Sequence, residues 1–327
     1  MNTIDHAIDR GALDDIIRSI DGLCEHDDWN EVLRVAFRCR RAHERGHQLW
    51  PAAMYAEYRA VLGAPPATSA RVASDSPGIF SLGPLCEVAA FAHLWPDIDP
   101  HLPDGPIRTQ IAAEAVVRGD VVDPSTVDLE LPGALQGWEP DYDLAEYSAE
   151  GVVSEAPLPP HLSEVTRGST TALRTDEEVE LALRDLVAPW LSSSEGACAT
   201  VSIHGPALGA VAVLTSGPIR AARIEPGLAL RVMAWAGASG GAQGRRRGAA
   251  AGRAGAWHAV AALGGDSTWP PNPDDIGEWV EELEWWWWDS TDEHKGWRLR
   301  LAVRDPAHDL AWAIDAHDHK NNGGAQD

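Results

Sequence analysis

Lysine is almost missing from this chain: only Lys295 and Lys320 occur among 26 basic residues, against 50 acidic residues in a total of 327. The resulting net charge of -24 opposes the phosphate contacts that supply most nucleic-acid affinity, and it disfavours anionic membrane surfaces equally. We therefore expect neither a nucleic-acid nor a membrane partner. A protein partner with a basic surface fits this charge better.

Cysteines are few, and no long apolar segment is present. Cys24, Cys39, Cys86 and Cys198 form no Cys-x-x-Cys pair, which argues against a zinc knuckle or a dithiol redox motif and favours buried, reduced thiols. No apolar run approaches the roughly 20 residues that cross a bilayer. The first residues are acidic where a secretory signal needs basic and then apolar residues. These features predict a cytoplasmic protein.

Motifs that identify a reaction are also missing. The chain contains no Walker loop and no dinucleotide-binding fingerprint. Its isolated histidines have no partnered nucleophile or acid at a readable spacing. We therefore predict no catalytic residue, no cofactor and no metal ligand, and we expect a binding or scaffolding protein without a catalytic centre.

Amphipathic helices are predicted for the first part of the chain. Apolar side chains recur at steps of three and four over residues 12–24 and again over residues 30–45. A third helix begins with Pro51 in its first turn, where proline is favoured, and two further helices follow. The short links between these helices predict helical hairpins, and we assign residues 1–119 to a helical domain.

The composition changes after this domain. Residues 120–170 are rich in proline, serine and acidic residues and have no sustained period, which predicts a long irregular connection. We assign residues 171–319 to an α+β domain and residues 320–327 to a disordered tail. The predicted fold class is α+β, in which an N-terminal helical region is followed by a C-terminal antiparallel meander covered by helices.

The end of the α+β domain has the pattern of three consecutive strands, EWWWWDS, WRLRLAVRD and LAWAIDAHD. In the middle strand, apolar residues alternate with Arg298, Arg300 and Arg304. This period of two predicts a strand with a single buried face. Two shorter strands, CATVSIHG and IRAARIE, are predicted earlier in the domain.

Residues 43–47 read His-Glu-Arg-Gly-His and so match the His-Glu-x-x-His pattern of zinc hydrolases. That site requires one helix through both histidines, because side chains four residues apart share a face only while the helix persists. Gly46 and Pro51 predict instead that His47 lies in a connecting loop, and no third zinc ligand is evident. We interpret the match as coincidental and keep a zinc-dependent hydrolase that uses His43, Glu44 and His47 as an alternative function.

A glycine- and arginine-rich segment, GASGGAQGRRRGAAAGR, occupies residues 237–253. If it is helical, its glycines at every fourth position form a groove that a second helix can approach: Gly240, Gly244, Gly248 and Gly252. Glycine costs about 1 kcal/mol per helical position relative to alanine, so either a close contact compensates for this cost or the helix breaks.

Arg246, Arg253 and Trp257 fall on the opposite face of that predicted helix, at steps of seven and four. They are the candidate residues for anion or partner binding, and an anion- or nucleotide-binding protein is the second alternative function. An internal salt-bridge surface is equally compatible with the residue types, since arginine pairs with carboxylates as readily as with phosphates. The acids for such pairs lie in the segment PDDIGEWVEELE: Glu278, Glu281 and Glu282.

Four consecutive tryptophans occupy positions 285–288. In a strand, Trp285 and Trp287 face one way and Trp286 and Trp288 face the other. An exposed pair would form a stacking platform for a sugar, a base or a partner, whereas a packed meander favours burial under a helix.

The stretches QLWPAAMYAEYR, SLGPLCEVAAF and GGAQGRRRGAAAGR resemble segments of an uncharacterised protein family of high-GC actinobacteria. The resemblance spans most of the chain, although WWWWD is richer in tryptophan than that family's pattern. It implies no activity, so the function of the chain is unknown at this point.

Overall fold

The computed structural model describes residues 3–43, 46, 48–76, 83–168, 172–290 and 296–319. Its chain divides into two compact units, one formed by residues 1–129 and 146–153 and the other by residues 130–145 and 154–327. Segments of the predicted connection, residues 120–170, belong to both units. The predicted tail, residues 320–327, lies outside the described residues.

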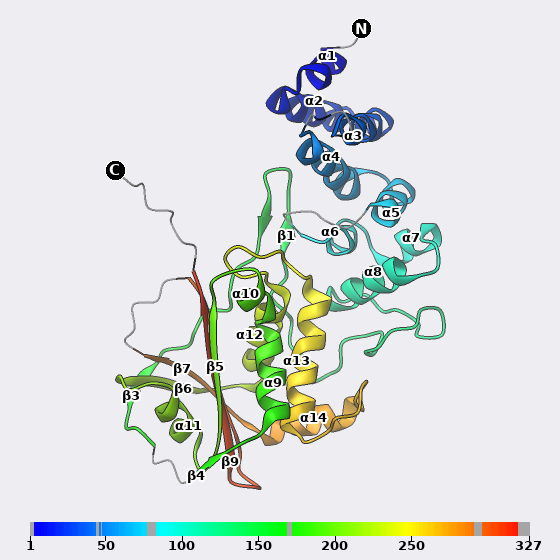
Figure 1. The fold of residues 1–327 in the computed structure, drawn as a ribbon. Helices are drawn as coiled ribbons and strands as arrows, with labels where there is room; N and C mark the ends of the chain where they lie inside the picture. The colour runs from blue at the N-terminus through cyan, green and yellow to red at the C-terminus, as the bar shows by residue number, and fades with distance from the viewer. Residues whose placement is uncertain are drawn as a thin grey trace, which may run out of the picture. The chain divides into compact units, whose positions relative to one another are not determined.

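Helices build the first unit, as the periodicity of the sequence predicts (Figure 1). In α2 the buried residues Ile16, Ile20 and Cys24 lie four apart and form one apolar stripe. Two short strands form a hairpin in which Tyr147 is paired with Val152. The elements are α1 (Thr3–Arg10), α2 (Leu13–Glu25), α3 (Trp29–His43), α4 (Trp50–Gly63), α5 (Pro66–Asp75), α6 (Leu85–Ala92), α7 (Trp95–Ile98), η1 (Asp99–His101), α8 (Pro106–Val117), β1 (Glu146–Tyr147) and β2 (Val152–Val153).

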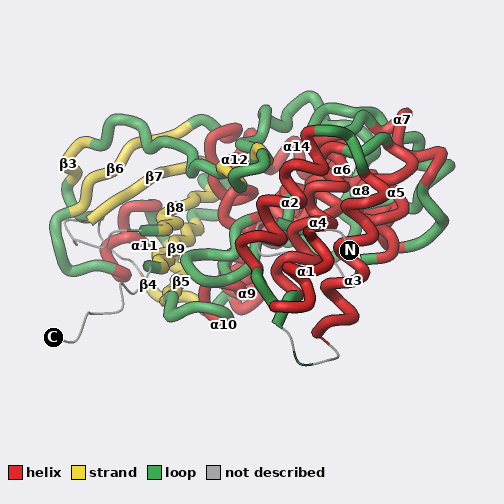
Figure 2. Tube along the Cα trace, turned by 90° about the horizontal axis from the view of Figure 1, so that it is seen from above, coloured by secondary structure: helices red, strands yellow, loops and turns green. Residues whose placement is uncertain are grey.

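The second unit contains a seven-stranded antiparallel sheet in the order β3-β6-β7-β8-β9-β5-β4, and Figure 2 shows these strands side by side. The three predicted strands of the meander are β7, β8 and β9, and both shorter predicted strands join the same sheet as β5 and β6. The elements are β3 (Ser163–Val165), β4 (Ala172–Arg174), α9 (Glu177–Leu186), α10 (Ala188–Ser192), β5 (Ala197–His204), α11 (Ala207–Leu214), β6 (Ile219–Ile224), α12 (Pro226–Ala238), α13 (Ala249–Leu263), α14 (Pro273–Glu282), β7 (Glu284–Ser290), β8 (Trp297–Asp305) and β9 (Leu310–Asp318). The α+β fold class is therefore confirmed.

Helices cover both faces of this sheet. α11 packs on one face, where small side chains such as Ala302 and Ala313 leave room for it beside Trp288. α9 and α12 pack on the other face, and α13 contacts both of these helices (Figure 1). Among the helices that the structure describes, none has both the length and the apolar composition to cross a bilayer.

The central strand β8 is therefore buried on both faces, and the expectation of a single buried face is wrong. Leu299 and Leu301 are buried on the α12 face, while Arg300 and Ala302 are buried on the α11 face. The alternation of leucine and arginine cannot reveal this, because a charged side chain at a buried position looks the same in a sequence as one in solvent.

Candidate functional site

The glycine- and arginine-rich segment forms a loop in its first half, so the second of the two alternatives, a break in the helix, holds there. α12 ends at Ala238 and α13 begins at Ala249. A Cβ atom on Gly244 would lie 2.1 Å from the backbone oxygen of Gly240, so these two glycines allow a tight turn of the chain. Gly241 adopts a φ of 72°, in the left-handed region that glycine enters without strain.

Close helix packing is confirmed farther along the segment. A Cβ atom on Gly252 would lie 2.1 Å from the backbone oxygen of Ala234 in α12, and one on Gly237 would lie 3.2 Å from the Cα atom of Gly252. α12 and α13 therefore cross with almost no side chain between them. The groove of small residues exists at this crossing, whereas Gly240 and Gly244 lie in the tight turn of the loop.

Arg253 and Trp257 are parts of a buried network around Glu139. The Nε and Nη2 atoms of Arg253 each donate to Glu139 over 2.8 Å, and Trp257 Nε1 donates to the same carboxylate over 2.9 Å. Tyr142 Oη is a further donor at 2.8 Å. Burial raises the pKa of Glu139, but the hydrogen bonds and charge of Arg253 outweigh burial and hold this pKa below its ordinary value.

The candidate residues Arg246, Arg253 and Trp257 do not form one site. Arg246 lies in the loop before α13, where its Nη1 atom donates to Ser154 Oγ over 3.0 Å. Arg253 and Trp257 lie in α13 and are buried. Arg253 pairs with Glu139 and not with any of the three acids that the sequence suggested.

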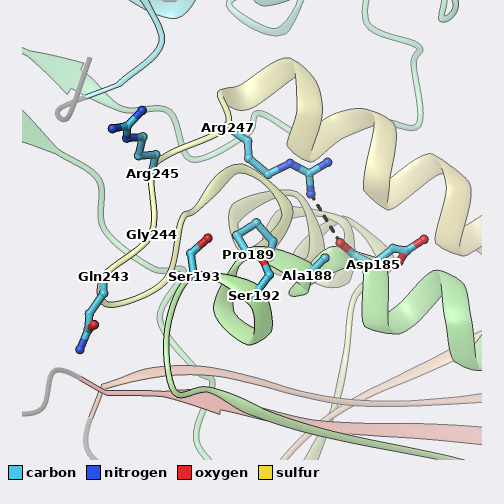
Figure 3. Close-up of a pocket in the computed structure, with 9 residues that line it drawn as sticks. All are labelled: Asp185, Ala188, Pro189, Ser192, Ser193, Gln243, Gly244, Arg245 and Arg247. Atoms are coloured by element: carbon cyan, nitrogen blue, oxygen red, sulfur yellow. Dashed lines mark hydrogen bonds between the residues drawn. The ribbon is translucent and has the colours of Figure 1, made fainter. Parts of the chain in front are cut away.

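A pocket of about 670 Å³ lies beside the loop (Figure 3). The side chain of Arg247 extends toward Asp185, and its Nη1 atom donates to the backbone oxygen of that residue over 3.5 Å. Figure 3 shows Arg245 and Gln243 pointing away from Ser193 rather than toward a common centre. The cationic groups of this pocket therefore do not converge on a place where an anion would sit.

The His-Glu-x-x-His stretch is described only in part. α3 ends at His43, and Gly46 has a φ of 92°, which is not a helical value. Glu44, Arg45 and His47 lie outside the described residues. Within the ranges that the structure describes, no group of three or more His, Cys, Asp or Glu residues is placed to hold a metal ion.

A second pocket, of about 480 Å³, is walled by tryptophans from three elements: Trp235, Trp287 and Trp297. We call it the tryptophan pocket. The rings of Trp235 in α12 and Trp297 in β8 are stacked, with centroids 5.2 Å apart and planes inclined by 15°. Residues 154–162 supply a further side of the pocket, including Pro157 and Pro159.

The tryptophan pocket lies where β7 and β8 stop pairing. Their ladder runs from Glu284↔Arg304 to Trp287↔Leu301. Beyond that pair, a side chain connects the two strands, because Trp288 Nε1 donates to the backbone oxygen of Leu301 over 3.2 Å. The opening in the sheet lets residues of both its faces line one pocket.

Each pair of the tryptophan run has one buried and one half-buried member. Trp285 and Trp288 are buried, whereas Trp286 and Trp287 are intermediate in exposure. Trp286 packs against the core beneath α11, and Trp287 lines the pocket. The run is thus neither a wholly exposed platform nor wholly buried.

Charged groups line the end of the pocket near the opening. Asp289 accepts hydrogen bonds from Arg220 at 3.0 Å, from Arg300 at 2.6 Å and from Arg298 at 3.4 Å. Arg300 also donates to Asp315 over 2.8 Å, and its guanidinium group lies on the Trp288 ring. Burial lowers the pKa of Arg300, but the hydrogen bonds and charges of Asp315 and Asp289 outweigh it and raise this pKa.

Trp235 carries an unsatisfied donor. Its side chain is 4% exposed, and its Nε1 atom has no hydrogen-bond partner among the described residues. A buried polar group without a partner costs about 1–3 kcal/mol, so such groups are rare in folded proteins and call for an explanation.

Sequence analysis missed this pocket because its walls come from distant segments. Besides the tryptophan run, the available signal was a pair of aspartates inside predicted strands, where aspartate is disfavoured. Asp315 is the register partner of Arg300, and Asp289 follows the tryptophan run directly. Arginines between two such strands are candidates for buried ion pairs.

Comparisons with known proteins give one match. The model of a family described as a family of unknown function, DUF6183, matches residues 14–320. No curated protein and no solved structure matches the chain significantly. The match agrees with the resemblance to an uncharacterised family that the sequence stretches indicated.

Proposed function

The chain belongs to this family of unknown function, DUF6183, and we propose that it is a binding protein that holds a planar small molecule in the tryptophan pocket. The observation that carries the proposal is a pocket of about 480 Å³ with indole walls from Trp235, Trp287 and Trp297. Small-molecule sites have volumes of about 300–1,000 Å³ and are mostly apolar with a few polar groups.

The chemistry of the walls supports a flat, unsaturated ligand. Aromatic rings that stack or meet edge to face contribute about 0.5–1.5 kcal/mol per pair beyond the burial of their area. Trp287 is only half-buried, so part of its ring faces the pocket or solvent. The stacked rings of Trp235 and Trp297 hold each other in place before any ligand arrives, which lowers the entropy lost on binding.

Thermal unfolding in the presence of a compound panel tests the proposal. The panel contains one- and two-ring aromatic carboxylates, sulfonates, amides and nucleoside monophosphates. A compound present at 100 times its Kd stabilises the protein by about 2.7 kcal/mol. For a unit of this size that corresponds to a rise in Tm of roughly 5–10 °C.

Two neighbouring tryptophans provide a matched pair of variants. Trp287→Ala removes a wall of the pocket, whereas Trp286→Ala removes the same side chain from the opposite face of the same strand. We expect a stabilising compound to lose its effect on Trp287→Ala and to keep it on Trp286→Ala. A panel without any stabilising compound, or equal stabilisation of both variants, would contradict the proposal.

The location that we propose is the cytoplasm. The four cysteines are free, and three of them are buried. Burial raises the pKa of Cys39 to about 11 and, with a smaller contribution from Glu114, that of Cys86 to about 12. Unpaired, unreactive thiols of this kind are typical of proteins in a reducing compartment.

A further inference from the structure

We infer that the ligand of the tryptophan pocket is an aromatic acid whose carboxylate or phosphate group binds Arg298. This inference rests on the proposed function and adds the chemical class of the ligand and the residue that selects it. The reasons lie in the hydrogen bonds of Arg298, in the guanidinium groups at this end of the pocket and in the indoles next to Arg298.

Arg298 has unused hydrogen-bonding capacity. A guanidinium group carries five N–H donors in a planar fork that suits two oxygens of a carboxylate or phosphate. Among the described residues, Arg298 makes one hydrogen bond, a long one of 3.4 Å to Asp289. Its side chain lines the pocket and is 29% exposed, so its remaining donors are accessible to a ligand.

Arg300, on the same face of β8, has a different role. Its side chain is 2% exposed, and it donates to both Asp289 and Asp315. It holds Asp289 in place, and Asp289 in turn contacts Arg298. Arg300 is therefore a positioning residue, and Arg298 is the residue that faces the ligand.

Guanidinium groups gather at this end of the pocket. Those of Arg220, Arg298 and Arg300 contact the carboxylates of Asp289 and Asp315. Of these three arginines, Arg298 lines the pocket and makes a single long hydrogen bond among the described residues. An acidic group on a ligand is therefore attracted to Arg298, in a chain whose net charge is -24.

The stacked indoles lie next to Arg298. Trp235 is stacked on Trp297, and Trp297 precedes Arg298 in β8. A ligand whose ring contacts these indoles can therefore place its acidic group at Arg298.

Calorimetric titration with two matched probes tests the inference. 2-Naphthoate and 2-naphthamide share the same rings, but only the first is an anion. We expect the unmodified protein to bind 2-naphthoate at least tenfold more tightly than 2-naphthamide. Arg298→Gln should abolish this preference, and Arg298→Lys should retain part of it because the positive charge remains.

The outcomes separate this inference from the proposed function. Equal binding of both probes by the unmodified protein, or an unchanged preference in Arg298→Gln, would overturn the inference and leave the pocket as a binding site for planar molecules. Failure of both probes to bind would overturn the proposed function and the inference with it. Arg298 is partly exposed, and the thermal unfolding of each variant shows whether it is folded.

Discussion

Replacement of Arg253 by methionine tests whether this arginine holds the second unit together or is available for a ligand. The variant Arg253→Met leaves the carboxylate of Glu139, which is 0% exposed, without its cationic partner. Removal of one member of a buried ion pair typically costs about 3–5 kcal/mol. Hydrogen bonds from Trp257, Tyr142 and the backbone of Gln136 remain on Glu139, so we expect a loss near the lower end, about 3 kcal/mol.

Urea unfolding followed by circular dichroism measures this loss, and thermal unfolding should show a fall in Tm of about 6–12 °C. The double variant Arg253→Met with Glu139→Gln no longer contains the buried charge, and it should recover a large part of the stability. Arg245→Met is the matched control, because Arg245 is exposed and its loss should change stability by no more than about 0.5 kcal/mol.

A loss for Arg253→Met as small as that for Arg245→Met would refute this reasoning. Arg253 would then contribute little to the fold, and its burial beside Trp257 would require a functional explanation such as anion binding.

Three further predictions concern packing, thiol reactivity and pH. Gly252→Ala should destabilise the protein by about 1–3 kcal/mol in urea unfolding, because the Cβ atom of the new alanine would lie 2.1 Å from the backbone oxygen of Ala234. Unchanged stability would show that α12 and α13 can separate without cost. Partial burial raises the pKa of Cys198 to about 11, so its reaction with a disulfide reagent at pH 8 should be on the order of a hundredfold slower than that of an ordinary thiol. An equal rate would contradict the raised pKa. The folded-state pKa of Glu139 is lowered, so its contribution to the free energy of unfolding is complete above the unfolded-state pKa of about 4.3 and is lost as the pH falls through the folded-state value. Glu139→Gln should flatten this loss of stability at acid pH. An identical pH profile for the variant would argue against a lowered pKa of Glu139.

Elements with a regular apolar period were predictable from the sequence. The stripe in α2 and the strands β7, β8 and β9 have periods of 3.6 and 2 that local sequence alone encodes. The same logic placed β5 and β6, although their position in the sheet depends on pairing with distant strands. Periodicity therefore predicts elements better than it predicts their neighbours.

The glycine- and arginine-rich segment shows where that logic ends. Its four-residue glycine repeat is compatible with a helix, but Gly240 and Gly244 meet backbone to backbone in a loop. The low helix propensity of glycine was the physical signal for this break. Only Gly252 has the close helix contact that the repeat indicated.

The candidate site was less predictable, because its residues come together only through tertiary structure. Glu139 lies 114 positions before its partner Arg253, and Trp235 lies far from Trp297 in sequence although their rings stack. Neither contact leaves a local pattern. Arg298 and Arg300 were visible as residues, but their positions at an opening between β7 and β8 follow from where the strand ladder ends.

The most direct test of the tryptophan pocket is the set of indole N–H signals in a ¹⁵N–¹H NMR spectrum during titration with a compound that stabilises the protein. Trp235→Phe and the corresponding single variants assign the signals of Trp235, Trp287 and Trp297. We predict saturable shifts at these three indoles and an unchanged signal for Trp257, whose N–H is bound to Glu139. Shifts at Trp257 with none at the three pocket indoles would contradict the account.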